Sequence, residues 1–209
     1  KGMDEIRKNE YAVLLAELKA GLNAYLATTP PTVRTRTLAD LIAFNTANAA
    51  RELALSDQKG FEKAEETQGL DTPGYQSARA TSLRLAGEEG IDKLLKDNQV
   101  IALVGPTMPP AMVTDVINGG LNAGVGGGPL AAVAGYPHLT VPMGAVRGLP
   151  VGLSFIGPKW SDAMILSLGY AYEQVSHKRI APRMPSAIEE GPDVAPVLEP
   201  MRHRHENLR

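Results

Sequence analysis

Apolar side chains recur every three or four residues in the first part of the chain, which is the spacing of one helical face. The pattern predicts a helix over residues 4–27, with a face formed by Tyr11, Leu14, Leu15, Leu18, Leu22, Tyr25 and Leu26. Pro30 and Pro31 follow this helix and cannot continue it. A second helix is predicted from the hydroxyl cap at Thr37 to Asn48, and a shorter one over residues 57–66.

A longer helix is predicted to begin after Thr72, because a hydroxyl cap followed by proline at the first helical position is typical of a helix start. We expect it to end near Asn98. Its inner face is expected to hold Leu83, Ala86, Gly90, Ile91, Leu94 and Leu95. The continuous apolar run over residues 100–104 then predicts a strand buried in a sheet that is covered on both faces.

Turn-forming residues dominate the next part of the chain. Twelve glycines and eight prolines lie between Gly105 and Pro158. We expect this part to form a short helix over 129–134 and two strands, 138–141 and 151–156, joined by tight turns. A last helix is predicted over 162–176. The predicted fold class is therefore α/β, with a mixed β-sheet flanked by α-helices.

Composition and charge exclude several classes of function. The 209 residues carry a formal net charge of −2, so the basic stripe of a nucleic-acid-binding protein is missing and no nucleic-acid partner is expected. No run approaches about 18 apolar residues, so no membrane partner is expected either. The absence of cysteine excludes disulfides and a thiol nucleophile, and it does not choose a compartment. The four histidines lack metal-ligand spacing on a predicted element, so we expect no metal and no cofactor.

Two short patterns come close to known catalytic motifs. Gly152-Leu153-Ser154 begins like the turn that presents a serine nucleophile, but its closing glycine comes one residue late and Ser154 lies within a predicted strand. Ser56 and Lys59 match a Ser-x-x-Lys pattern whose two partner motifs are absent. The sequence therefore assigns no catalytic residue. A small hydrolase that uses Ser56 and Lys59 remains an alternative interpretation.

A more specific pattern lies in the glycine- and proline-rich part. Residues 135–144 (GYPHLTVPMG) are followed by residues 148–157 (GLPVGLSFIG) and by Asp162. Together they resemble the C-terminal signature of the amidase signature family. Residues 105–111 (GPTMPPA) and 38–45 (LADLIAFN) are also similar to segments of that family. The resemblance runs in register from about residue 3 to 182.

The resemblance implies amide hydrolysis by a serine nucleophile, a bridging serine and a lysine base, with release of an acid and of ammonia or an amine. In the family these three residues lie in a Gly/Ser-rich region of the N-terminal half. This chain contains no Ser-Ser pair, so none of the three can be placed on it. We therefore expect residues 1–181 to be the C-terminal portion of an amidase signature domain, with a partial amidase signature fold, inactive alone. Residues 182–209 are expected to be a proline-rich tail.

Thr107 and Met108 are the predicted substrate-binding residues. They follow a predicted strand, and α/β sheets usually place ligands beyond strand ends. We expect them to line a pocket wall for a small-molecule amide in the complete enzyme; a buried structural turn is the alternative. Self-association of the isolated chain is also expected, through apolar surface that is left uncovered. A non-catalytic binding or assembly module on the same scaffold is the alternative function.

Overall fold

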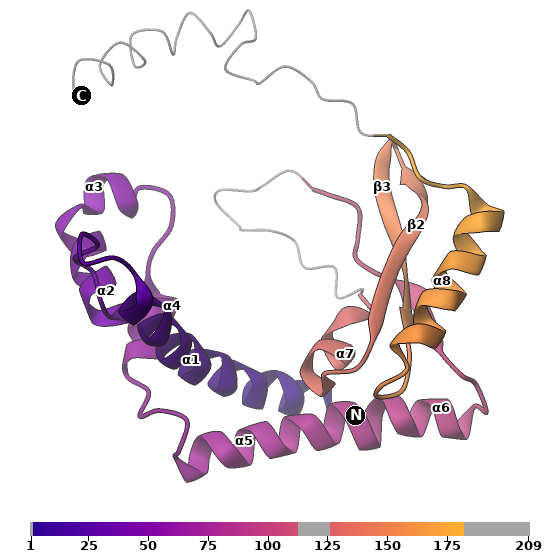
Figure 1. The fold of residues 1–209 in the computed structure, drawn as a ribbon, viewed down its shortest axis with the longest axis horizontal. Coiled ribbons are helices and arrows are strands. Elements are labelled where there is room, and N and C mark those ends of the chain that lie inside the picture. Colours follow the sequence, from indigo (N-terminus) through magenta and orange to yellow (C-terminus); the bar gives the residue numbers. More distant parts are fainter. Residues whose placement is uncertain (1, 113–125, 182–209) are drawn as a thin grey trace, which may run out of the picture. The chain divides into compact units, whose positions relative to one another are not determined.

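The computed structural model describes residues 2–112 and 126–181, and its elements are labelled in Figure 1. In chain order these elements are α1 (Met3–Thr28), α2 (Leu38–Ala47), α3 (Ala49–Glu52), α4 (Lys59–Glu65), α5 (Pro73–Leu83), the π-helix η1 (Arg84–Asp92), α6 (Lys93–Asp97), β1 (Leu103–Pro106), α7 (Gly128–Ala134), β2 (His138–Val146), β3 (Leu149–Ile156) and α8 (Asp162–Ser176). Helices packed against a sheet confirm the predicted fold class. The predicted tail, 182–209, lies outside the described residues, and the domain boundary at 181 stays a prediction.

The sheet has three strands in the order β1-β3-β2, and both of its strand pairs are antiparallel. A mixed sheet was predicted, but the described residues contain no parallel pair. The reason is local: Arg147 and Gly148, both with positive φ, form a two-residue turn that folds β3 directly back on β2. Such a turn permits only antiparallel pairing between the strands that it joins.

The first strand lies later in the chain than predicted, at Leu103–Pro106 rather than at residues 100–104. The preceding helix ends with Gln99 in the left-handed region, and the Val100 N–H donates to the Leu95 carbonyl. Val100 therefore belongs to the helix end. The predicted burial on both faces is also wrong, because β1 is an edge strand of the described sheet and Val104 is 64% exposed.

The two faces of the sheet pack against different helices (Figure 1). On one face, Val141 and Phe155 pack with Ile165 of α8. On the other face, Ile156 joins the larger core formed with Ile6, Ala86, Ile91, Leu95, Ala131 and Ala134. This second face carries the polar side chains of the candidate site, so α7 and its preceding glycines pack directly against that site.

Local sequence explains the early helices. Thr37 caps α2 by accepting from the Asp40 N–H, and the Asp40 carboxylate accepts from the Thr37 N–H, which completes a capping box. In the predicted apolar face of α1, Leu26 is buried as expected, but Tyr11, Leu14, Leu18 and Tyr25 are exposed. The other residues that α1 buries are Ile6, Val13 and Ala16. Within residues 2–112 and 126–181, no helix is both long and apolar enough to cross a membrane.

The long helix predicted from Pro73 to Asn98 is continuous but contains nine residues of π-helix. A π-helix bonds residue i to i+5, so it holds more residues in each turn than an α-helix. The buried positions are Ser82, the adjacent pair Ala86 and Gly87, Ile91 and Leu95, so the inner face advances by four to five residues in each turn. This wider spacing leaves the predicted core residues Leu83 and Leu94 exposed. Gly90 is required here, because a Cβ would lie 2.7 Å from the Leu85 carbonyl oxygen.

We expect Gly169→Ala to destabilise the chain by about 1–3 kcal/mol, since a Cβ at this position of α8 would overlap the Leu139 side chain of β2. The matched control is Gly21→Ala in α1, where no atom lies within 4 Å of the new Cβ. This control is expected to stabilise the chain by about 0.5–1 kcal/mol through helix propensity. Urea unfolding of both variants measures the difference, and equal effects would contradict the packing of α8 on β2.

Candidate substrate-binding site

Thr107 and Met108 lie directly after β1, as the sequence predicts, but their side chains have different surroundings. The Thr107 N–H donates to the Gly152 carbonyl over 2.8 Å and so continues the pairing of β1 with β3. Its side chain is half-buried against the sheet. Met108 is 63% exposed. Of the two, Met108 therefore offers more surface to a ligand, whereas Thr107 is held by its neighbours.

Four polar side chains form a continuous hydrogen-bonded network across the three strands. The Ser154 hydroxyl donates to Thr107 Oγ1 over 2.9 Å, and Thr107 Oγ1 lies 2.5 Å from Thr140 Oγ1. His138 Nε2 lies 2.6 Å from Ser154 Oγ. Because the single Ser154 proton is donated to Thr107, the hydroxyl accepts from His138, which places a proton on Nε2. Bonds in such a chain polarise and strengthen one another.

The strand register explains why these side chains meet. Gly105 and Thr140 both lie opposite Ser154, on either side of β3, and Thr107 lies two residues beyond Gly105. Residues directly opposite or two apart share one face of a sheet. Between the two threonines lies Gly152, where a Cβ would approach Thr107 Oγ1 to 2.8 Å and Thr140 Oγ1 more closely still. Only glycine leaves room for both hydroxyls.

A second set of glycines covers the network from the α7 side. The Gly127 N–H donates to the Pro106 carbonyl over 3.1 Å, which anchors this segment to the end of β1. A Cβ at Gly127 would lie 3.4 Å from the Ser154 Cβ, and a Cβ at Gly128 would lie 3.4 Å from His138 Cε1. Backbone therefore packs directly on the polar side chains, and Ser154 is 0% exposed.

Burial decides the role of Ser154. A serine nucleophile must reach its substrate, and this hydroxyl is covered and already donates its proton to Thr107. The short contact with His138 therefore belongs to a structural network, which agrees with the expectation from its mid-strand position. Within the described residues, no group of three or more His, Asp or Glu side chains is arranged to hold a metal ion.

Ser56 and Lys59 do not form a nucleophile and base pair in the structure. The Ser56 hydroxyl donates to the Asp57 carbonyl at 3.4 Å, and Lys59 Nζ pairs with Asp57 Oδ2 at 2.7 Å. The hydrogen bond that Lys59 donates to Asp57 raises the pKa of Lys59. A lysine that acts as a general base needs the opposite shift, so the geometry disfavours this alternative.

Tyr136 connects the start of β2 to the π-helix. Its hydroxyl donates to Asp92 Oδ2 over 2.7 Å. This hydrogen bond, helped by partial burial, raises the pKa of Tyr136 to about 12. The ring passes so close to Gly87 that a Cβ there would lie 3.1 Å from the Tyr136 oxygen. The Gly-Tyr-Pro segment that carries part of the family resemblance is therefore fixed to η1.

The sequence predicts Thr107 as a substrate-binding residue, which stays a prediction, and it does not reveal the three side chains that hold Thr107. Thr140 and Ser154 were each placed in a strand without a partner, because the alignment of the two strands was unknown. The available signal was the alternation of His138 and Thr140 on one face, together with Ser154 on the next strand. That signal becomes usable only when the strand register is known.

Comparison with known proteins gives three informative relatives. A probable amidase of Arabidopsis thaliana is 30% identical over 176 residues, which cover 83% of this chain and 30% of the relative. A glutamyl-tRNA(Gln) amidotransferase subunit of Halorhodospira halophila is 35% identical over 99 residues, 40% of this chain and 18% of the relative. The peptide amidase of Stenotrophomonas maltophilia superposes with a TM-score of 0.79 and 42% identity, over 88% of this chain and 37% of that protein. No protein-family model matches the chain.

The arrangement of helices around a small antiparallel sheet is thus that of part of an amidase. The chain belongs to the amidase signature family, as the resemblance of residues 105–111, 135–144 and 148–157 implies. It spans about a third of the length of the Arabidopsis amidase and of the peptide amidase.

We expect Ser154→Ala to destabilise the chain by about 1–2 kcal/mol, because it removes the fully buried hydroxyl that hydrogen-bonds both His138 and Thr107. The control is Ser167→Ala on α8, an exposed serine whose loss should change the free energy of unfolding by less than about 0.5 kcal/mol. Chemical unfolding measures both values. A Ser154→Ala effect no larger than that of the control would contradict the network.

The raised pKa of Tyr136 predicts a loss of stability at high pH. A group whose pKa is raised on folding stabilises the folded state below its unfolded pKa, near 10, and this contribution is lost as pH rises toward 12. The free energy of unfolding should therefore fall between about pH 10 and 12. Asp92→Asn should flatten that slope, whereas Asp97→Asn, on α6, should not. An unchanged slope in Asp92→Asn would contradict the assignment.

Proposed function

We propose that this chain is part of an amidase that hydrolyses a carboxylic amide to an acid and ammonia or an amine. The observation that carries the proposal is the 42% identity and TM-score of 0.79 with the Stenotrophomonas maltophilia peptide amidase over 88% of the chain. The name of that relative makes a peptide amide the first substrate to test.

In the proposed reaction a serine hydroxyl attacks the amide carbonyl, and the lysine base takes its proton through the bridging serine. The C–N bond breaks, and ammonia or an amine leaves with a proton. Water then attacks the resulting ester, which releases the acid and restores the serine. None of these three residues is assigned to this chain, so the chain alone is proposed to be inactive.

The proposed contribution of this chain is one wall of the substrate pocket at the end of β1. Met108 supplies the exposed apolar surface, and its sulfur lies close to Gly126, at 3.5 Å from the position of a Cβ there. Thr107 fixes the segment through its bonds to Ser154, Thr140 and Gly152. The hydrogen-bonded network thus acts on the pocket by holding the backbone that carries Met108.

A chimera tests this function. In the chimera this chain replaces the matched 37% of the Stenotrophomonas maltophilia peptide amidase, and ammonia release from a peptide amide is measured. We expect steady turnover by the chimera and none by the isolated chain. Turnover by the isolated chain, purified free of other amidases, would contradict the missing catalytic residues. A folded chimera without activity would contradict the proposed function.

Within the chimera, Met108→Ala tests the pocket wall. Loss of a half-exposed apolar side chain should raise KM about fivefold and leave kcat nearly unchanged. Val175→Ala, an exposed apolar truncation on α8, is the matched control and should change neither constant. An unchanged KM in Met108→Ala would remove Met108 from the proposed wall.

A specific observation also favours the second candidate, a binding or assembly module. Besides the uncovered face of α1, the outer face of α8 exposes Leu166, Tyr170 and Val175 at 59%, 64% and 84%. Uncovered apolar faces of this kind associate with other protein surfaces. The isolated chain is therefore proposed to self-associate, which light scattering during the same purification reports; a monomer would oppose this candidate.

A further inference from the structure

The outer edge of β1 carries backbone groups that no described strand pairs. The Thr107 N–H donates to the Gly152 carbonyl, so residues 103, 105 and 107 direct their N–H and C=O groups toward β3. Ala102 and Val104, which alternate with them, therefore direct theirs outward. In the part of the chain that the structure describes, neither residue makes a backbone hydrogen bond on that side. An edge of this kind is a template for one more strand.

The segment that forms this edge lacks the residues that usually keep an edge strand unpaired. Residues 100–105 (VIALVG) contain no charged residue and no proline. Ile101 and Val104 are each 64% exposed. Natural edge strands are commonly blocked by lysine, proline or a β-bulge, and an apolar edge without them pairs with another chain.

The opposite edge of the sheet, formed by β2, is blocked in two ways. Because the Gly152 carbonyl faces β1, Pro142, which lies opposite Gly152 in β2, directs its backbone outward. Proline has no N–H, so this outer edge lacks a donor there. The unpaired Met143 then forms a β-bulge, which interrupts any ladder added along β2. The described sheet therefore has one edge open to pairing and one that is blocked.

We propose that β1 pairs with β1 of a second copy of this chain, in an antiparallel dimer with two-fold symmetry. An antiparallel pair of identical strands is self-complementary, so one edge supplies both sides of the contact. With Ala102 opposite Val104 of the second copy, the open N–H and C=O groups of both edges are paired. The two sheets then form one continuous antiparallel sheet, whose outer strands are both β2. Because β2 is blocked, assembly stops at the dimer.

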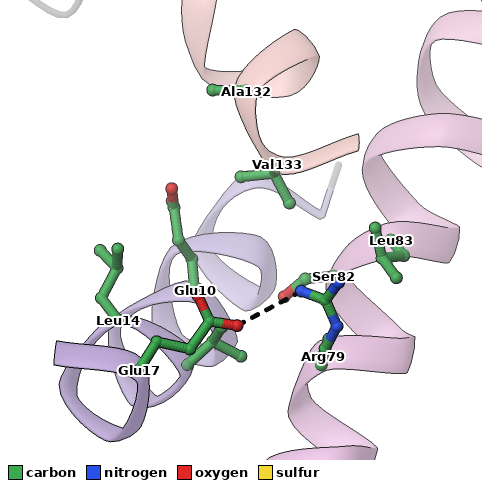
Figure 2. A pocket seen from close by; sticks show the side chains of 9 residues that line it. Glu10, Leu14, Glu17, Arg79, Ser82, Leu83, Ala132 and Val133 are labelled. Carbon is green, nitrogen blue, oxygen red and sulfur yellow. Dashed lines mark hydrogen bonds and ion pairs between the residues drawn. The ribbon is translucent and has the colours of Figure 1, made fainter. Parts of the chain in front are cut away.

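The charges on the chain favour this edge over the exposed face of α1 as the contact between two copies. Leu14 on that face lies at the pocket shown in Figure 2, beside Glu10 and Glu17. A two-fold contact through α1 would bring these carboxylates close to those of the second copy, and like charges oppose association. Residues 100–105 bring no charge to their contact. The proposal identifies the surface for the self-association proposed above and does not depend on the amidase function.

Sedimentation equilibrium and amide hydrogen exchange of the full chain, each over a range of protein concentrations, test the proposal. We expect a monomer–dimer equilibrium without larger species, and slower exchange of the Ala102 and Val104 N–H groups as the dimer forms. A monomer at every concentration would overturn the proposal, and so would a dimer in which these two amides exchange as they do in the monomer. Filaments that grow without limit would overturn it too, because they need a second open edge. None of these outcomes bears on the amidase activity of the chimera.

Variants locate the contact. Val104→Lys should raise the dissociation constant of the dimer at least about tenfold, because it brings charges of the same sign together at the paired edges. Val104 is mostly exposed, so the monomer should keep its fold, which circular dichroism checks. Val104→Thr keeps a β-branched side chain and the same backbone groups, and should keep the dimer. Val175→Lys, at an exposed position of α8, is the matched control and should leave the dissociation constant unchanged. A dimer weakened by Val175→Lys and not by Val104→Lys would place the contact on α8 and overturn the proposal.

Discussion

One extra residue in β2 controls which side chains of the sheet face each other. Val146 lies opposite Leu149 at the turn, and counting back without interruption would place Thr140 opposite Phe155. Met143 is an added, unpaired residue between Pro142 and Gly144, so Thr140 lies opposite Ser154 instead. Because strand side chains alternate, the uninterrupted register would turn Thr140 toward α8 and Leu139 toward the polar face. Gly144, with φ of +148°, allows this bulge.

The register that the bulge sets places the hydrogen-bonded network on one face of the sheet and the hydrophobic packing with α8 on the other. Thr140, Ser154 and Thr107 share the face covered by the glycines before α7, while Leu139 and Phe155 pack toward α8. Glycines at 127, 128 and 152 let backbone lie directly on polar side chains, which excludes water from Ser154. A buried hydroxyl is stable only when it is paired, and Ser154 finds its partners in His138 and Thr107 on either side of β3. The same bonds hold the segment that presents Met108.

The apolar side chains of the chain fall into two groups, one buried between the sheet and its helices and one exposed on the outer faces of α1 and α8. Those between the sheet and its helices form ordinary cores, around Ile156 and Ile165. Those on the outer faces of α1 and α8 are uncovered among the described residues. The chain spans about a third of the length of its relatives. The uncovered apolar faces of α1 and α8 therefore fit the proposal that other parts of the amidase pack against them.

The helices could be predicted from the sequence because their signals are local. The cap at Thr37, the Thr72-Pro73 start and the turn at Arg147-Gly148 each act within a few residues. The apolar spacing also predicted the length of α1, but not which of its sides is buried. The motif in residues 135–157 indicated the family, and the position of Thr107 directly after a strand was predicted, while its role in binding stays a prediction. The network around Thr107 and the π-helical spacing that exposes Leu83 were decided by tertiary structure. The network depends on contacts between strands distant in sequence, whose register shifts with a single inserted residue.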